Sequence, residues 1–211
     1  MMKNGLARRM GFWVLAMLMT ATSPVWAQEI SAASGVVEMS IGNPDAQVEV
    51  IEYASLTCPH CAAFHRDVFP KLKAGYIDTG KVHFTLREVY LDRAGLFASI
   101  TARCGGQDKF FPMVERILAT QNEWSRLDSQ PAIVQRLRSI ALSMGVTDDA
   151  FRACFYDEAK AELLVDAEDK NRREYDITST PTFVINGRTY SNMPYDEFAG
   201  VLDAALSDQE G

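Results

Sequence analysis

Hydrophobic residues recur with two different periods in the first half of this 211-residue chain. A dense apolar run at Val48–Ala54 predicts a buried strand, and the alternation of apolar and polar residues at 82–87 predicts a half-buried one. Between them, Phe64, Val68 and Leu72 stand four residues apart, which is typical of one face of a helix. The order strand, helix, strand implies a right-handed crossover and parallel pairing of the two strands.

A long helical stretch follows this unit, and a weaker pattern precedes it. The apolar spacing at 93–175 is helical throughout, so we expect a lobe of several helices there. Asp128 or Ser129 is expected to cap one of these helices and Thr147 to cap the next. Before the first buried strand, residues 36–39 are apolar enough to form an edge strand.

The chain returns to strand character near its C-terminal end. Residues 182–190 read as two short strands around Asn186 and Gly187, a dipeptide that favours a two-residue hairpin turn. Pro181 directly precedes the first strand, a place that suits either a trans bond at a strand start or a cis bond in a tight bend. Apolar residues after Pro194 share one helical face, so a terminal helix is expected.

The chemistry of the chain is concentrated in Cys58-Pro59-His60-Cys61, where the first buried strand ends and the helix begins. A helix N-terminus presents free N–H groups and the positive end of the helix dipole, which favour a thiolate over a thiol. Pro59 suits the first helical position because its missing N–H would have no partner there. A protonated His60 would add positive charge. We therefore expect Cys58 to be an exposed nucleophile of low pKa and Cys61 to be a shielded resolving thiol in thiol–disulfide exchange.

Two other uses of this cysteine pair are open on spacing alone. A zinc site could recruit His60 or His65, but structural zinc normally takes four protein ligands and the chain has no second close pair of cysteines. A purely structural Cys58–Cys61 disulfide would close so small a loop that it would constrain the unfolded chain little. Redox chemistry is favoured over both, and we expect no metal and no cofactor besides the redox-active disulfide.

Glu52 interrupts the apolar run of the first buried strand. A buried carboxylate has a raised pKa and is costly unless it has a task. From its place six residues before Cys58, Glu52 could lie under the helix start and exchange protons with Cys61. The alternative is a paired carboxylate on an exposed strand face. His65 and His83 are expected to be solvated surface residues without a functional role.

Residues 1–27 differ in kind from the rest of the chain. Lys3, Arg8 and Arg9 form a positive region, followed by an apolar stretch and a Val-Trp-Ala cleavage site that ends at Ala27. This pattern indicates a secretory signal peptide rather than a mature transmembrane helix. The whole chain has a net charge of −7, and removing three positive charges makes the remainder more acidic. Such a balance argues against a nucleic-acid partner.

An exported chain with four cysteines belongs in an oxidising compartment. Cys104 and Cys154 lie fifty residues apart in segments with helical spacing. The even number of cysteines favours a structural disulfide between them, which the loop-entropy account credits with roughly 4 kcal/mol. The alternative is two separate buried thiols that behave as small hydrophobic residues.

Together these motifs resemble the DsbA family of exported thiol–disulfide oxidoreductases, an α/β thioredoxin fold with an inserted all-helical domain. The resemblance covers essentially the whole chain after the signal peptide. It divides the chain into a first thioredoxin part at 28–92, a helical insertion at 93–175 and a second thioredoxin part at 176–211. Cys104 and Cys154 are similar to the extra disulfide found in one branch of the family.

The resemblance also implies roles for individual residues. Cys58 corresponds to the nucleophile that forms the mixed disulfide, and Cys61 to the thiol that resolves it. Pro181 corresponds to the family's cis-proline, and Thr180 would supply backbone hydrogen bonds to a substrate peptide lying as an extra strand. Glu52 falls where the family has its buried acid.

One position departs from the well-known oxidases of the family, which have a valine before the cis-proline. This chain has Thr180 there, as several isomerase and reductase relatives do. Pro59 and His60 nevertheless favour a stabilised Cys58 thiolate, and a low-pKa thiolate is a good leaving group, so the disulfide is readily passed on.

We therefore expect a monomeric periplasmic oxidase that donates its Cys58–Cys61 disulfide to unfolded or partly folded exported proteins. A quinone-linked membrane protein resembling DsbB would reoxidise it. The first alternative is a reductase or isomerase of the same fold. The second, from another class, is a non-catalytic periplasmic protein that holds Cu(I) or another metal through Cys58 and Cys61.

Overall fold

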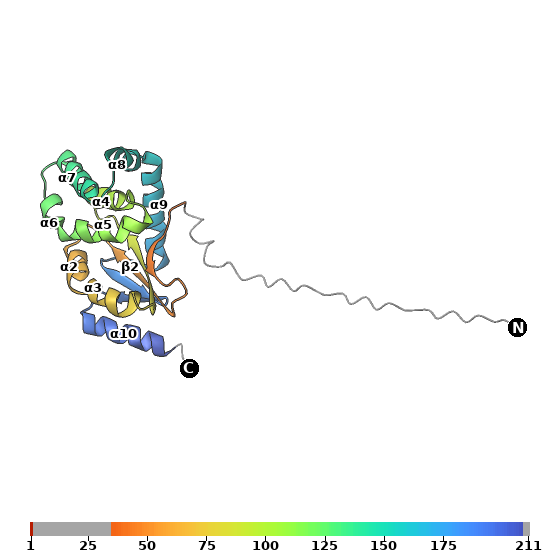
Figure 1. Cartoon of the computed structure of the whole chain (residues 1–211). Helices are drawn as coiled ribbons and strands as arrows, with labels where there is room; N and C mark the ends of the chain where they lie inside the picture. The colour runs from red at the N-terminus through yellow and green to blue at the C-terminus, as the bar shows by residue number, and fades with distance from the viewer. Residues whose placement is uncertain (2–34, 209–211) are drawn as a thin grey trace.

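A five-stranded sheet is joined to a lobe of helices in this computed structural model (Figure 1). The structure describes residue 1 and residues 35–208, so residues 2–27 of the predicted signal peptide lie outside the described residues. Among the described residues, no helix is both long enough and apolar enough to cross a membrane. The mixed α/β class agrees with the prediction from the sequence.

The sheet has the strand order β1-β3-β2-β4-β5, which places β2 at its centre. Its strands are β1 (Met39–Gly42), β2 (Val48–Ala54), β3 (Val82–Glu88), β4 (Thr182–Ile185) and β5 (Arg188–Ser191). β2 and β3 pair in parallel, which confirms the pairing expected for the crossover unit. β1 pairs antiparallel with β3, β4 with β2, and β5 with β4.

The edge strand β1 lies further along the chain than the predicted 36–39. Within β1 the side chains of Met39 and Ile41 point toward the protein, since Met39 is buried and Ile41 partly buried, while Ser40 between them is exposed. Val37, which the prediction included in the strand, is about half exposed. The strand ends at Gly42, whose φ of 97° favours glycine. A Cβ at Gly42 would come within 2.4 Å of the Val82 carbonyl oxygen, so only glycine lets β1 end this close to β3.

The helix that follows β2 is divided into three consecutive pieces. These are α2 (Pro59–Asp67), α3 (Phe69–Leu72) and a π-helical turn, η1 (Lys73–Ile77). The division falls at Val68, whose φ of −114° departs from helical values. Pro70 follows two residues later and has no N–H to donate to the Arg66 carbonyl, so the hydrogen-bond ladder cannot run through unbroken.

Six helices form the lobe between β3 and β4 in the described chain (Figure 1). They are α4 (Arg93–Arg103), α5 (Gln107–Ala119), α6 (Gln121–Trp124), α7 (Gln130–Ser143), α8 (Asp148–Phe155) and α9 (Glu158–Glu174). Two predicted caps are confirmed, because the hydroxyls of Ser129 and Thr147 accept hydrogen bonds from the N–H groups of Ala132 and Ala150.

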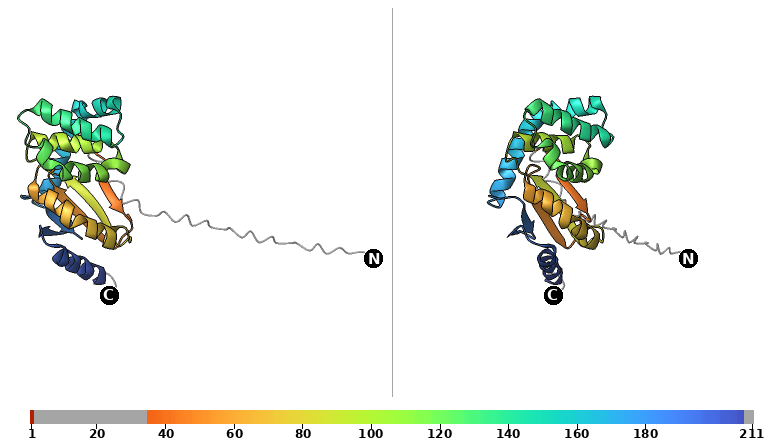
Figure 2. Two further views of the ribbon diagram at one scale, coloured as in Figure 1. Left: turned by 60° about the vertical axis from the view of Figure 1, so that its left-hand side comes forward. Right: turned by 90° about the vertical axis from the view of Figure 1, so that its left-hand side faces the viewer.

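The C-terminal segment forms the predicted hairpin and terminal helix. Asn186 and Gly187 both have positive φ, 45° and 78°, as a tight two-residue turn between β4 and β5 requires. The helix α10 (Tyr195–Ser207) follows Pro194. Figure 2 shows the lobe and α10 at opposite ends of the molecule, with the sheet between them.

The main hydrophobic core extends from the sheet into the lobe. The ring centroids of Phe69 in α3 and Phe84 in β3 lie 6.4 Å and 6.2 Å from the ring centroid of Phe111, which belongs to α5 in the lobe. A buried ion pair joins the same two parts. Arg103, at the end of α4, makes two hydrogen bonds to the carboxylate of Glu88, at the end of β3. The lobe is therefore attached to the sheet by apolar packing and by charge.

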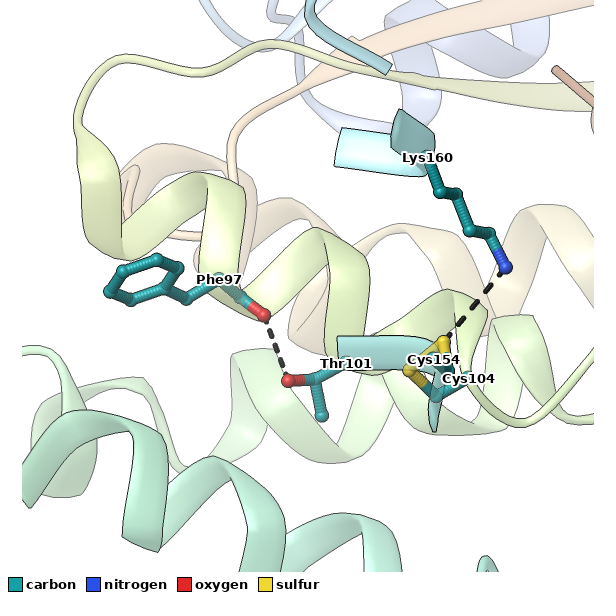
Figure 3. The surroundings of a disulfide bond; sticks show 5 residues. All are labelled: Phe97, Thr101, Cys104, Cys154 and Lys160. Atoms are coloured by element: carbon teal, nitrogen blue, oxygen red, sulfur yellow. Dashed lines mark hydrogen bonds between the residues drawn. A yellow bond between two sulfur atoms is a disulfide. The ribbon is translucent and has the colours of Figure 1, made fainter. Parts of the chain in front are cut away.

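A disulfide between Cys104 and Cys154 joins the end of α4 to α8 (Figure 3). The Nζ atom of Lys160 lies 3.9 Å from the sulfur of Cys154. This is the pairing that the sequence favours, and the bond lies entirely within the helical lobe. The other two cysteines, Cys58 and Cys61, are free thiols.

Candidate active site

The Cys58–Cys61 pair lies at the end of the central strand. Cys58 is the N-cap residue of α2, with extended φ and ψ of −79° and 121°, and Pro59 occupies the first helical position. Cys61 follows in the first turn and is fully buried. Pro59 and His60 are exposed. The local sequence thus places one sulfur at the helix start and the other beneath it.

Cys58 is less exposed than the sequence suggests, because the chain before β4 covers it. Only 6 % of Cys58 is accessible, and its thiol donates a 3.4 Å hydrogen bond to the backbone carbonyl of Thr180. The Thr180–Pro181 peptide bond is cis. β4 begins at the next residue, and its antiparallel pairing with β2 brings Thr182 opposite Tyr53. Sheet pairing therefore places Thr180 against Cys58.

The two thiols have pKa values displaced in opposite directions. The pKa of Cys58 is lowered from 9.0 to about 5, chiefly by a hydrogen bond from the Cys61 thiol, which outweighs the opposing effect of burial. The Thr180 side chain and the N–H groups of Cys61 and His60 lower it further. The Cys58 hydrogen bond, burial and the negative charge of Glu52 raise the pKa of Cys61. When the two cysteines are reduced, the negative charge therefore lies on the Cys58 sulfur, and Cys61 stays a neutral thiol.

The low pKa of Cys58 predicts the pH dependence of its alkylation. We expect the rate of iodoacetamide modification of the reduced protein to rise with pH through a midpoint near 5, since the thiolate is the reacting form. Thr180→Val removes the hydroxyl donor and should move that midpoint upward. A midpoint in the ordinary thiol range, about 8.5, would contradict the assignment of the charge to Cys58.

Glu52 and His65 form a buried pair near Cys61. Glu52 is fully buried, and its Oε2 atom lies 2.9 Å from Nε2 of His65. The alternative of an exposed carboxylate is therefore wrong, and so is the prediction that His65 is solvated, because it is only 5 % exposed. His65 follows Cys61 by one helical turn and shares its buried face. The four-residue spacing between Cys61 and His65 is the sequence signal that could have predicted the burial of His65.

Gln121 is a site residue for which the sequence gives no signal. Its amide nitrogen donates to the carbonyl oxygens of Leu56 and Cys58, at 2.8 Å and 3.0 Å. Gln121 begins α6, so these hydrogen bonds attach the helical lobe directly to the active-site segment. The partners are 65 and 63 residues away along the chain, and no local pattern connects them.

The described residues contain no group of three or more histidine, cysteine, aspartate or glutamate side chains arranged to hold a metal ion. The arrangement provides a stabilised thiolate and a shielded thiol, the two groups that thiol–disulfide exchange uses, next to a buried carboxylate–imidazole pair.

Comparisons with known proteins agree with this chemistry. A family model described as Thioredoxin matches residues 34–204. A Rickettsia bellii relative, provisionally named a protein-disulfide oxidoreductase, is 32 % identical over 174 residues. The match covers 82 % of this chain and 66 % of the relative, so the chain spans just under two thirds of that relative's length.

Solved structures show the same architecture. The crystal structure of alpha-DsbA1 from Wolbachia pipientis is 30 % identical, with a TM-score of 0.73, and the match covers 81 % of this chain and 92 % of that one. BdbD from Bacillus subtilis in its oxidised form is 23 % identical with a TM-score of 0.71, covering 81 % and 93 %, and shares the fold. The fold is thus that of thioredoxin with a helical insertion. The chain belongs to the thioredoxin family and, within it, to the DsbA-like disulfide oxidoreductases.

Proposed function

We propose that this protein donates the Cys58–Cys61 disulfide to exported proteins as they fold. The observation that carries the proposal is the pKa of Cys58, lowered to about 5 beside a Cys61 whose pKa is raised. A stabilised thiolate favours the reduced form of the pair, so its disulfide is a strong oxidant. The same thiolate is a good leaving group when the substrate completes its own disulfide.

The reaction transfers two electrons from the substrate to the protein. A substrate thiolate attacks the Cys58 sulfur, the Cys58–Cys61 bond breaks, and Cys61 leaves and takes up a proton. A second substrate thiolate then attacks the substrate sulfur of the mixed disulfide, and Cys58 leaves as a thiolate. The substrate gains a disulfide and the protein ends as the dithiol. A membrane protein resembling DsbB would restore the disulfide.

The substrate peptide would lie beside Thr180 and Pro181. Backbone groups just before a strand can pair with an extended peptide as an added strand, which binds unfolded segments with little regard to sequence. A periplasmic location follows from the signal peptide expected at residues 1–27. Such substrates are newly exported chains whose cysteines are still reduced.

The test is the equilibrium of the Cys58–Cys61 pair with glutathione, with the Cys104–Cys154 disulfide intact. We expect a reduction potential above about −180 mV, the value of protein disulfide isomerase. A potential at or below about −270 mV, that of thioredoxin, would overturn the oxidase proposal and favour a reductase. Thr180 would then be a better guide to the direction of electron flow than the Cys58 thiolate.

A further inference from the structure

The exchange reaction of the proposed function requires a proton at a buried atom. Cys61 is completely inaccessible to solvent, and it leaves as a thiolate when the substrate attacks Cys58. A thiol of high pKa is a poor leaving group unless it is protonated as the bond breaks. The proton must therefore reach Cys61 through the protein rather than directly from water.

Glu52 and His65 are groups of the right kind, and Glu52 is near enough for its charge to act on Cys61. The Glu52 carboxylate is fully buried, and its charge acts on Cys61. Its Oε2 atom is 2.9 Å from Nε2 of His65, whereas its Oε1 atom has no hydrogen-bond partner in the described structure. An unsatisfied buried carboxylate oxygen is costly, so it calls for an explanation. A proton passing between Oε1 and Cys61 provides one.

His65 connects this carboxylate to the protein surface. The Nδ1 atom of His65 is buried and also lacks a partner among the described residues. The imidazole is held by aromatic packing, with its centroid 4.7 Å from the ring of Phe69 and 5.5 Å from that of Phe64. The side chain lines a surface hollow between α2 and the α5–α6 region. Nε2 of His65 thus contacts Glu52, and the same side chain borders the surface hollow.

We propose that His65 is a positioning residue that passes protons between this hollow and Cys61 through Glu52. The inference rests on the proposed exchange reaction. As the Cys58–Cys61 bond breaks, the proton on His65 Nε2 moves to the Glu52 carboxylate and from there to the Cys61 sulfur, while Nδ1 takes up a proton from the hollow. Glu52 ends as the carboxylate that it was, and Cys61 has gained one proton. His65 ends with its proton on Nδ1, so exchange with solvent must return it to the Nε2–H form, and the net change is one proton from solvent to Cys61. Reoxidation runs the path in reverse.

The charged groups around His65 are few and can be named. Glu52 faces it from β2, and Arg66 is its neighbour on α2. Glu115 from α5 and Arg126 after α6 line the same hollow. A pH profile assigned to His65 must therefore be compared with profiles of Glu115→Gln and Arg126→Gln, which leave the Glu52–His65 hydrogen bond intact.

The experiment uses single-turnover oxidation of a dithiol peptide by the full-length oxidised protein between pH 5 and 9. His65→Gln retains an amide that can donate to Glu52 but cannot transfer a proton, and His65→Phe retains the aromatic packing. We expect both variants to be slower by about 10²-fold, the lower range for general acid–base catalysis. We also expect them to lose the pH dependence that the Glu115 and Arg126 variants keep. Added imidazole should restore part of the rate of the glutamine variant.

Two outcomes would overturn the proposal. One is a wild-type rate and pH profile in either His65 variant. The other is a slower variant whose pH profile is unchanged and which imidazole does not rescue, because a purely structural role gives that result. The glutathione equilibrium separates this failure from failure of the oxidase proposal. If wild-type protein proves to be a reductase, the His65 effect should appear in the reverse reaction, which moves the same proton.

Discussion

Replacement of Cys58 by alanine is expected to abolish disulfide transfer to a reduced peptide. Cys58 is the more accessible of the two sulfurs, and at pH 7 its pKa of about 5 makes it almost entirely thiolate in the reduced protein. An ordinary thiol near pKa 8.5 would be only a few per cent ionised there. Since Cys61 is fully buried with a raised pKa, it cannot take over. The measurement is the oxidation rate of a dithiol peptide, which should fall to the uncatalysed level.

The matched control is Cys61→Ala, which leaves the Cys58 nucleophile in place. Given a peptide that already holds a disulfide, this variant should accumulate mixed disulfides: the Cys58 thiolate attacks the peptide disulfide, one peptide thiol is released, and no resolving thiol remains. These adducts should disappear on addition of a reductant. A non-catalytic Cu(I) protein would lose metal binding in either variant and trap nothing. Residual transfer by Cys58→Ala at more than a few per cent of the wild-type rate would contradict the assignment of the nucleophile.

The second large effect concerns stability rather than chemistry. Glu88→Ala is expected to lower the free energy of unfolding by about 3–5 kcal/mol, because it leaves the Arg103 guanidinium buried without its counter-charge. The side chains of Glu88 and Arg103 are only 4 % and 7 % exposed. Arg103 also donates a hydrogen bond to the Val37 carbonyl. If Arg103 moves when Glu88 is removed, the segment before β1 is disturbed as well. Urea unfolding of the oxidised protein measures the change.

Two further variants show whether the charge itself is responsible. Asp169→Ala removes an exposed ion pair with Arg173 on α9 and should change the stability by less than about 1 kcal/mol. Replacing Glu88 and Arg103 together by methionine should recover much of the loss, since no unpaired charge is then buried. A loss below about 1 kcal/mol for Glu88→Ala would mean that Arg103 finds water or another partner in that variant.

Local sequence signals predicted the elements that carry the site. The apolar run of β2, the alternation of β3 and the Asn186-Gly187 turn depend on residues that are neighbours in the chain. The start of α2 was predictable for the same reason, because the cap geometry at Cys58 and the proline after it are local. These features determine where the two sulfurs lie.

The environment of the sulfurs was less accessible to sequence reasoning. His65 is polar and was expected at the surface, but its burial is decided by the face of α2 that packs over Glu52 in β2. Gln121 reaches the Cys58 carbonyl only because the helical lobe folds back onto the sheet. Such contacts depend on tertiary packing between distant segments, which no single-segment pattern contains.

The short edge strands β1 and β5 protect a protein whose proposed partners are unfolded chains. Each edge of the described sheet is formed by only four residues, and β5 begins with the exposed, charged Arg188. Long, flat, apolar edges are templates for aggregation, whereas short and charged ones resist it. Extended segments of client proteins would thus find little sheet edge on which to polymerise.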